Sequence, residues 1–238
     1  MAHRPGIRAI LFDTFGTVVD WRTSIISDLG PWARARGLQA DWALLADLWR
    51  GQYEPQKDRV RRGDLPWTRL DELHRDALDS VLDRMGLSDL SSDEREHINA
   101  VWHRLQPWPD AVPGLQRLRR LHVIGPLSNG NVSLLVNMAR HAALPWDVIF
   151  SAEHFRRYKP DPETYLGACR MLDLSPEAVV MCAAHNDDLR AARALGLKTA
   201  FIARPTEYGP GPTTYLAPTD DWDFVASDIV DLATQMDA

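Results

Sequence analysis

The chain has 238 residues, of which 45% are hydrophobic and 25% are charged, and its formal net charge is −6. This length fits one large domain, or one domain with an insert, and the composition excludes a disordered or fibrous chain. The net negative charge argues against nucleic acid or a membrane as a partner, so we interpret arginine-rich stretches such as Arg59–Arg62 as solvated faces.

The first predicted element is a strand over Ile7–Phe12 that ends at Asp13. A polar turn that contains glycine follows it, Thr14-Phe15-Gly16-Thr17. The apolar run within this strand, Ala9–Phe12, is too short for a signal peptide or a membrane span, and no later run approaches 18 apolar residues. We therefore expect neither a secretory leader nor a transmembrane helix.

A helical region is predicted from Trp21 to Trp108. Apolar residues recur at helical spacing in two stretches, and polar residues at their starts are typical helix caps. Seven of the nine tryptophans lie in this region, where they either fill a core or line an apolar pocket. The predicted helices are one capped by Asp41 with Trp42, Leu45, Trp49 and Tyr53 on one face, one from Trp67 to Met85 that stops at Gly86, and one through Trp102 that starts with a Ser91–Glu94 capping box.

Short apolar runs alternate with helical patterns after Pro109, which is typical of a parallel sheet with helices on both faces. The predicted fold class is therefore α/β, with a Rossmann-like core over 1–20 and 109–238 and a helical cap over 21–108. After Gly209 we expect an irregular loop with Pro210, Pro212 and Pro218, and then a final strand or helix. The alternating elements are strands His122–Leu127, Val148–Ala152, Val179–Ala183 and Lys198–Ala203, and helices Asn131–His141, Pro162–Leu172 and Leu189–Leu195.

Cys169 and Cys182 are the only cysteines, and their spacing is not that of a metal site. Two cysteines in a chain of this length do not indicate a disulfide framework. We therefore expect the reducing cytoplasm as the compartment.

Polar residues follow four of the predicted strands. In an open parallel sheet, ligands bind outside the carboxyl ends of the strands, so these residues should converge on one edge. That convergence indicates a site more strongly than any single residue. The stretches are Asp13–Thr17, Ser128–Asn131, Glu153 and His154 with Lys159 further on, and His185–Asp188.

Asp13 is expected to be partly desolvated at the end of its strand, so it needs a cation to stay ionised, and Lys159 is the natural candidate. An ionised, positioned aspartate is a competent nucleophile, and the alternative role is a helix cap. Asp161 and Pro162 are expected to begin a helix.

Four other residues keep two interpretations at this point. Ser128 and Asn129 either form a turn or present donors to an anion. His185 is either a satisfied histidine or a site residue. Asp188 opens a predicted helix, so capping competes with catalysis.

Four stretches together resemble the haloacid dehalogenase superfamily, and they come in that family's order. The stretches are DTFGT (Asp13–Thr17), LSN (Leu127–Asn129), KPDPETY (Lys159–Tyr165) and HNDDLRAARALG (His185–Gly196). The resemblance covers nearly the whole chain and implies that the helical insert is the family's cap.

Departures from the family's phosphatases indicate the chemistry. Phosphatases carry a second aspartate at the position of Phe15 and a carboxylate at that of Ala184, so two parts of a magnesium site are missing here. Phe15-Gly16-Thr17 instead resembles the L-2-haloacid dehalogenase branch, which needs no metal or other cofactor.

That branch implies a role for each matching residue. Asp13 is the nucleophile that Thr17 supports, and Arg50 receives the halide. Ser128 and Asn129 match residues near the substrate carboxylate and the halide. Lys159, Tyr165 and Asp188 match further motif positions.

The fourth motif departs from the branch. Its Ser-x-Asn pair is replaced by Ala183 and His185, so His185 is a candidate for positioning water. The stretches DWR (Asp20–Arg22), WPD (Trp108–Asp110) and AAHN (Ala183–Asn186) resemble a subgroup that acts on haloacetates, including fluoroacetate.

The expected function is metal-independent hydrolysis of short (S)-2-haloacids or haloacetates through an aspartyl ester on Asp13, with His185 or Asp188 activating water. The alternative is a phosphatase or phosphotransferase that acts on a small phosphorylated metabolite. The resemblance also implies a homodimer. Further candidates for substrate contact are Thr14, Phe15, Trp67 and Asn186.

Overall fold

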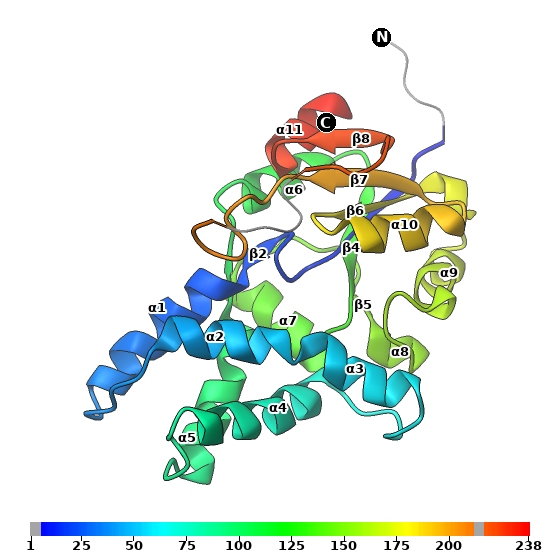
Figure 1. Cartoon of the computed structure of the whole chain (residues 1–238). Coiled ribbons are helices and arrows are strands. Elements are labelled where there is room, and N and C mark those ends of the chain that lie inside the picture. The colour runs from blue at the N-terminus through cyan, green and yellow to red at the C-terminus, as the bar shows by residue number, and fades with distance from the viewer. Residues whose placement is uncertain (1–5, 212–216) are drawn as a thin grey trace.

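A six-stranded parallel sheet forms the centre of the computed structural model, which describes residues 6–211 and 217–238 (Figure 1). The strand order is β5-β4-β1-β6-β7-β8, and every neighbouring pair is parallel. The predicted α/β class is therefore confirmed. The strands are β1 (Ala9–Phe12), β4 (Val123–Ser128), β5 (Phe150–Ser151), β6 (Val179–Ala183), β7 (Lys198–Ile202) and β8 (Phe224–Ala226).

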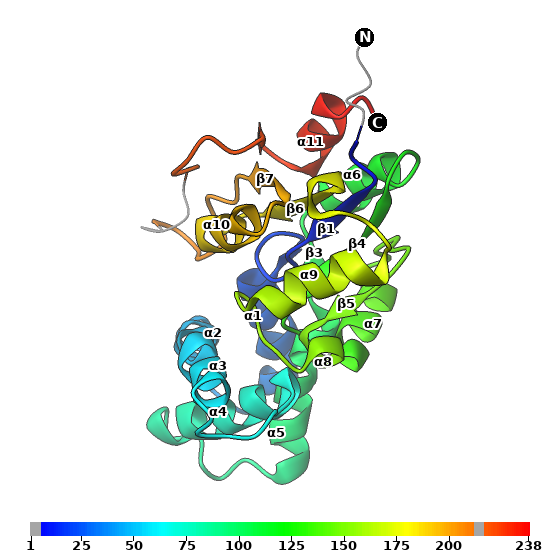
Figure 2. The same ribbon diagram turned by 90° about the vertical axis from the view of Figure 1, so that its right-hand side faces the viewer.

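Helices cover both faces of this sheet (Figures 1 and 2). Successive residues of a strand point to opposite faces, and β1 shows this directly. Ala9 and Leu11 belong to one buried cluster, which includes residues of α9 and α10, whereas Ile10 and Phe12 belong to another, which includes residues of α6, α7 and α11. These helices are α6 (Ala111–Leu118), α7 (Val132–His141), α8 (Ala152–Phe155), α9 (Pro162–Met171), α10 (Asn186–Ala194) and α11 (Ile229–Gln235).

A second group of helices lies between β2 (Val19–Asp20) and β3 (Gln106–Pro107), which pair antiparallel with each other. In Figure 1 the helices α2 to α5 face the sheet from below. We propose that the β2–β3 pair marks where the chain passes between core and cap, close to the expected boundaries at 20 and 109. The helices of this second group are α1 (Trp21–Arg34), α2 (Trp42–Gly51), α3 (Tyr53–Arg61), α4 (Leu70–Arg84), α5 (Ser92–Asn99) and the 3₁₀ segment η1 (Ala100–Arg104).

The predicted caps form as expected at two helices. The Asp41 side chain accepts a hydrogen bond from the Leu44 backbone N–H, and Ser91 and Glu94 make a reciprocal capping box. These side chains satisfy backbone donors that have no partner inside the helix.

Several predicted boundaries were wrong. The strand expected from Ile7 begins at Ala9, the helix expected from Leu189 begins at Asn186, and the helix expected through Trp102 gives way to a 3₁₀ segment after Asn99.

The strand expected over Val148–Ala152 contains only Phe150 and Ser151, because a capping box between Ser151 and His154 starts α8 at once. The helix expected from Trp67 begins at Leu70. The residues expected to start this helix contact Tyr158 instead. The Trp67 ring packs on the Tyr158 ring, and the Tyr158 hydroxyl donates to the Thr68 carbonyl.

The carboxyl-terminal part follows the prediction at its end, where β8 and α11 come after a loop. Pro212 of that predicted loop, and residues 1–5 of the segment considered for a leader, lie outside the described residues. No helix within the described ranges combines the length and the apolar character that crossing a bilayer requires. Cys169 and Cys182 are both buried free thiols.

Candidate active site

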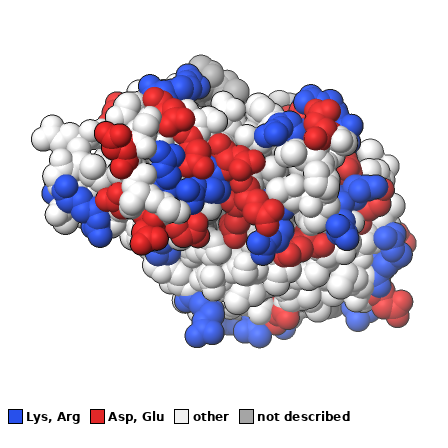
Figure 3. Space-filling view, turned by 90° about the horizontal axis from the view of Figure 1, so that it is seen from below, with Lys and Arg blue, Asp and Glu red and all other residues white. Residues whose placement is uncertain are grey.

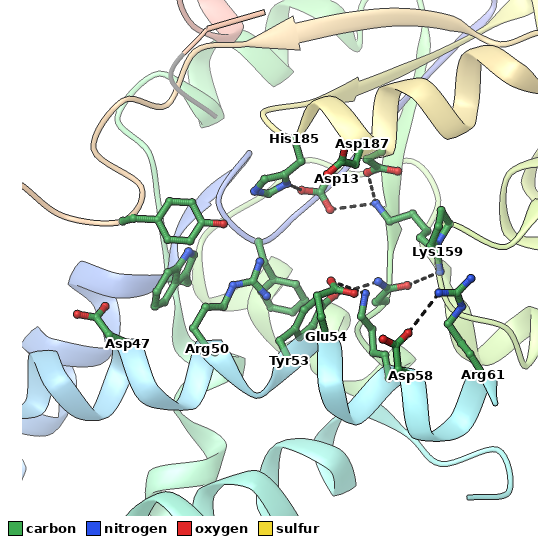
Figure 4. Close-up of a pocket in the computed structure, with 18 of the residues that line it drawn as sticks. Asp13, Asp47, Arg50, Tyr53, Glu54, Asp58, Arg61, Lys159, His185 and Asp187 are labelled. Atoms are coloured by element: carbon green, nitrogen blue, oxygen red, sulfur yellow. Dashed lines mark hydrogen bonds and ion pairs between the residues drawn. The ribbon is translucent and has the colours of Figure 1, made fainter. Parts of the chain in front are cut away.

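Asp13 lies at the point where the strand order reverses. From β1 the chain runs outward through β4 to β5 and then returns to β6 on the other side of β1. Such a switch point leaves a crevice at the carboxyl ends of the strands, which is where open α/β sheets bind ligands. A cavity of about 760 Å³ lies here, between the sheet and the helices α2 and α3 (Figure 4).

The Asp13 carboxylate has hydrogen-bond donors on both oxygens. Oδ1 accepts from Lys159 Nζ at 3.0 Å, whereas Oδ2 accepts from Thr17 Oγ1 at 2.9 Å and faces His185 Nδ1 at 3.0 Å. Burial alone would raise the pKa of Asp13, but the charges of Lys159 and His185 outweigh it and hold the pKa well below its usual range. Asp13 is thus an ionised, buried carboxylate. It does not cap a helix, since Asp20 caps α1.

Lys159 joins the two aspartates of the site. Its Nζ donates to Asp13 and, at 2.5 Å, to Asp188 Oδ2, while the Tyr165 hydroxyl donates to Asp188 Oδ1. Burial would lower the pKa of Lys159, but Asp13 and Asp188 raise it further, so the ammonium stays charged. Asp161 begins α9 as predicted, although its carboxylate accepts from Arg61 rather than capping the helix.

The residues present do not fit a magnesium ion beside Asp13. Phe15 is buried with its ring edge against Trp102, so it cannot serve as a ligand. The Lys159 ammonium already neutralises Asp13 and Asp188, which are the carboxylates a cation would need. Ala184 contributes only its backbone N–H, which donates to Thr17 Oγ1 at 2.9 Å and so ties the first loop to the fourth.

His185 has a carboxylate at each ring nitrogen. Nδ1 lies 3.0 Å from Asp13 Oδ2, and Nε2 lies 3.1 Å from both oxygens of Glu207. Because a carboxylate only accepts hydrogen bonds, this geometry requires a proton on each nitrogen, which makes His185 an imidazolium. Burial would lower the pKa of His185, but Glu207 and Asp13 together raise it to about 10.

Glu207 is a site residue that the sequence analysis missed. Its side chain is 1% exposed, and Oε1 also accepts from Trp21 Nε1 at 3.1 Å. A side chain at Gly16 would place its Cβ 2.1 Å from Glu207 Oε1, so the glycine is required for this approach. Glu207 belongs to no motif, but it follows β7, and the rule that ligands gather at carboxyl ends would have found it there.

Arg50 presents an unsatisfied donor in the same cavity. Its guanidinium stacks over the rings of Tyr53, at 4.2 Å, and Trp21, at 5.6 Å. Its Nη1 is buried and has no hydrogen-bond partner within the described residues. Because a buried charged donor without a partner is costly, this group is suited to an anion that arrives with the ligand.

Asn129 holds two neighbours in place. Its Oδ1 accepts from the Lys159 backbone N–H at 2.7 Å, and its Nδ2 donates to the Tyr53 hydroxyl at 2.9 Å. Tyr53 was predicted only as part of a helix face. Ser128 is buried and accepts from the Gly130 N–H, and the buried Thr14 Oγ1 has no partner among the described residues.

Four residues predicted to contact substrate do not line the cavity, namely Thr14, Trp67, Ser128 and Asn186. The Asn186 side chain donates to the Ala217 carbonyl and accepts from Trp222 Nε1, so it fastens the carboxyl-terminal loop instead of reaching the substrate. Trp67 packs on Tyr158 and is not part of the cavity lining. Of the tryptophans, Trp21 does line the cavity, while Trp49 and Trp102 are buried in the core.

Taken together, these groups can perform nucleophilic substitution. An ionised carboxylate faces a cavity in which a guanidinium can stabilise a leaving anion, as Figure 4 shows for Asp13 and Arg50. An imidazole beside the same carboxylate can exchange protons with water.

Comparison with known proteins gives consistent matches. The family profile of a haloacid dehalogenase-like hydrolase matches residues 7–196. (S)-2-Haloacid dehalogenase 1 of Pseudomonas sp. (strain CBS-3) is 31% identical over 223 residues, which cover 87% of this chain and 90% of the relative.

Two crystal structures are similar over almost the whole chain. That of the L-2-haloacid dehalogenase PA0810 has a TM-score of 0.95 and 52% identity, and covers 98% of this chain and 99% of its own. That of the defluorinating L-2-haloacid dehalogenase Rha0230 has a TM-score of 0.95 and 50% identity, and covers 98% and 96%.

Proposed function

The chain belongs to the haloacid dehalogenase-like hydrolases, and on that basis we propose that it hydrolyses the carbon–halogen bond of short (S)-2-haloacids and haloacetates. One feature of the cavity supports this above all. The ionised Asp13 lies in the same cavity as the unpartnered Nη1 of Arg50, so a nucleophile and an acceptor for the leaving halide are both present. The relatives named above support the same substrate class.

In the first step, an oxygen of Asp13 attacks the substrate carbon and the halide leaves toward Arg50. Oδ1 is the better nucleophile, because it accepts one hydrogen bond whereas Oδ2 accepts two. The attack inverts the carbon, so an (S)-2-haloacid gives an (R)-2-hydroxy acid. Removal of one preorganised donor such as Arg50 costs about 3–4 kcal/mol in comparable sites.

In the second step, water attacks the ester carbonyl of Asp13, and His185 takes its proton. Asp188 is less suited, because Lys159 and Tyr165 already occupy both of its oxygens. Ester formation removes the negative charge of Asp13, which is one cause of the raised pKa of His185. The imidazolium then releases a proton to solvent, and the neutral Nδ1 can accept one from water.

The steps balance over one cycle. One haloacid and one water are consumed, and one hydroxy acid, one halide and one proton are released. Glu207 accepts from Nε2 throughout and so directs Nδ1 toward Asp13. Glu207 is a positioning residue in this scheme.

Replacement of Glu207 by Gln tests that role through the pH profile. Burial lowers the pKa of His185, and Glu207 is the largest of the groups that raise it, so the substitution lowers this pKa. Since ester hydrolysis needs neutral His185, we expect the rising limb of kcat against pH to move to lower pH and the plateau of kcat to fall. Glu177→Gln, at an exposed glutamate, is the matched control. An unchanged limb in the Glu207 variant would contradict the assignment.

Halide release tests the function itself. We expect halide release to continue in EDTA, because the described residues beside Asp13 do not form a metal site. The halide should come from chloroacetate and from the (S) enantiomer of 2-chloropropionate, but not from the (R) enantiomer. The likeness to a defluorinating relative leads us to propose fluoroacetate as a further substrate. A strict requirement for magnesium, or phosphate release from p-nitrophenyl phosphate without halide release, would restore the phosphatase alternative.

We also propose a compartment and an oligomeric state for the enzyme. Two buried free thiols support a reducing cytoplasm as its compartment. The homodimer that the resemblance implies stays a prediction, which size-exclusion chromatography with light scattering can test.

A further inference from the structure

A second pocket, of about 340 Å³, is lined by four arginines and a single carboxylate. Arg61 and Arg62 come from the end of α3 on the cap, and Arg156 and Arg157 come from the turn after α8 on the core. We call this feature the arginine pocket. Its one acidic lining residue, Asp161, accepts from Arg61.

The arginine pocket adjoins the catalytic cavity, because Arg61 lines both. Lys57 lies one helical turn before Arg61 on α3, and its buried ammonium sits over the Tyr53 ring at 4.3 Å. Arg50 lies near the end of the preceding helix α2, and all three residues line the cavity. Lys57 also pairs with Glu54 at 2.8 Å, so the cations between the arginine pocket and the proposed halide site alternate with carboxylates.

Four carboxylates of the cavity lining do not favour an anionic substrate, although each of them forms an ion pair. Asp47, Glu54, Asp58 and Asp187 all line the cavity, and the whole chain carries a net charge of −6. Acidic and basic side chains are interspersed on the face seen from below in Figure 3, so attraction must come from a local cluster. The arginine pocket is such a cluster.

The four arginines are only partly neutralised by neighbours. Arg61 pairs with Asp58 and Asp161, Arg62 pairs with Asp64, and Arg157 is 3.8 Å from Glu163. The Arg156 guanidinium has no ion pair among the contacts of the described residues. Most of these pairs are solvent-exposed and weak, and Arg156 keeps a guanidinium that an arriving anion can bind.

We propose that the arginine pocket is an entry site for small carboxylate anions, which collects the haloacid before it passes along Lys57 to Asp13. This inference rests on the proposed function for the identity of the anion. Clefts with a local excess of charge raise the local concentration of oppositely charged ligands, and this effect weakens as salt screens it.

The test compares two triple variants that remove the same total charge. R62Q/R156Q/R157Q empties the pocket of three arginines, and R84Q/R120Q/R170Q removes three exposed arginines at the end of α4, after α6 and in the last turn of α9. For chloroacetate at low ionic strength, we expect the pocket variant to lose at least about threefold in kcat/KM with kcat unchanged. In the wild type and the control, kcat/KM should decline as salt is added. In the pocket variant, most of that decline should be absent.

Binding without turnover separates this inference from the proposed function. In an Asp13→Asn background, the association rate of chloroacetate is measured by tryptophan fluorescence in a stopped-flow instrument, since Trp21 lines the cavity. A slower, salt-insensitive rate in the pocket variant alone supports the entry site, even if the parent enzyme released no halide. Equal losses in both triple variants, or none in the pocket variant, would overturn it while halide release by the parent still stood.

Discussion

Replacement of Asp13 by Asn is expected to abolish halide release, with a loss in kcat of more than about 10⁴-fold, as when other catalytic nucleophiles are removed. An amide is a poor nucleophile, and it also cannot neutralise Lys159 and His185, which both contact the Asp13 carboxylate. The measurement is halide release from chloroacetate over hours. No burst of halide is expected, because the first step itself is lost.

Two controls make the Asp13 experiment decisive. Asp187→Asn removes a carboxylate that lines the same cavity but is 71% exposed, and it should retain turnover. Mass spectrometry of the peptide that contains residue 13 checks that Asn has not deamidated to Asp. Full activity in an Asp13→Asn protein that has stayed Asn would rule out nucleophilic catalysis by this residue.

Replacement of His185 by Gln is expected to stall the second step and leave the first. The variant should release about one halide per enzyme and then turn over about 10²–10⁴-fold more slowly, the usual range for loss of a general base. Lys159 still balances the charge of Asp13 in this variant, so the carboxylate should remain a nucleophile. Rapid-quench halide measurement gives the burst, and intact mass gives one carboxymethyl group added per chain.

The outcome that would contradict this role for His185 is a fall in the burst rate with no accumulated adduct. Such a result would mean that His185 supports the attack by Asp13 rather than the hydrolysis of the ester. His141→Gln, at an exposed histidine that does not line the cavity, is the matched control. It should behave as the wild type in both phases.

Much of this site could be predicted from the sequence because the rule behind it is topological. Asp13, Asn129, Lys159 and His185 each follow a predicted strand or its loop, and a parallel sheet brings such positions to one edge whatever the exact strand lengths. The structure places all four at the cavity, with Thr17 and Asp188 bound to members of the set. A buried, ionised Asp13 also needs a neighbouring cation, and this requirement identifies Lys159 from the sequence.

The site residues that were predicted wrongly show that the position of a residue along a strand or helix does not determine where its side chain points. Asn186 opens α10 beside His185, yet its amide turns away to satisfy the Ala217 carbonyl and the Trp222 indole. Trp67 precedes α4 instead of lying in it, and its ring packs on Tyr158. Glu207 follows β7, so its place at the sheet edge could have been predicted, but its contact with His185, 22 residues away in the chain, is encoded by no local pattern.

Isotope labelling under single-turnover conditions tests the two-step account most directly. Excess enzyme is mixed with chloroacetate in ¹⁸O-water, and both the product and the peptide with Asp13 are weighed by mass spectrometry. If Asp13 forms the ester and water attacks its carbonyl, the label enters the Asp13 carboxylate and the first product carries none. Label in the first product, with none in Asp13, would show direct attack of water on the substrate and would contradict the account.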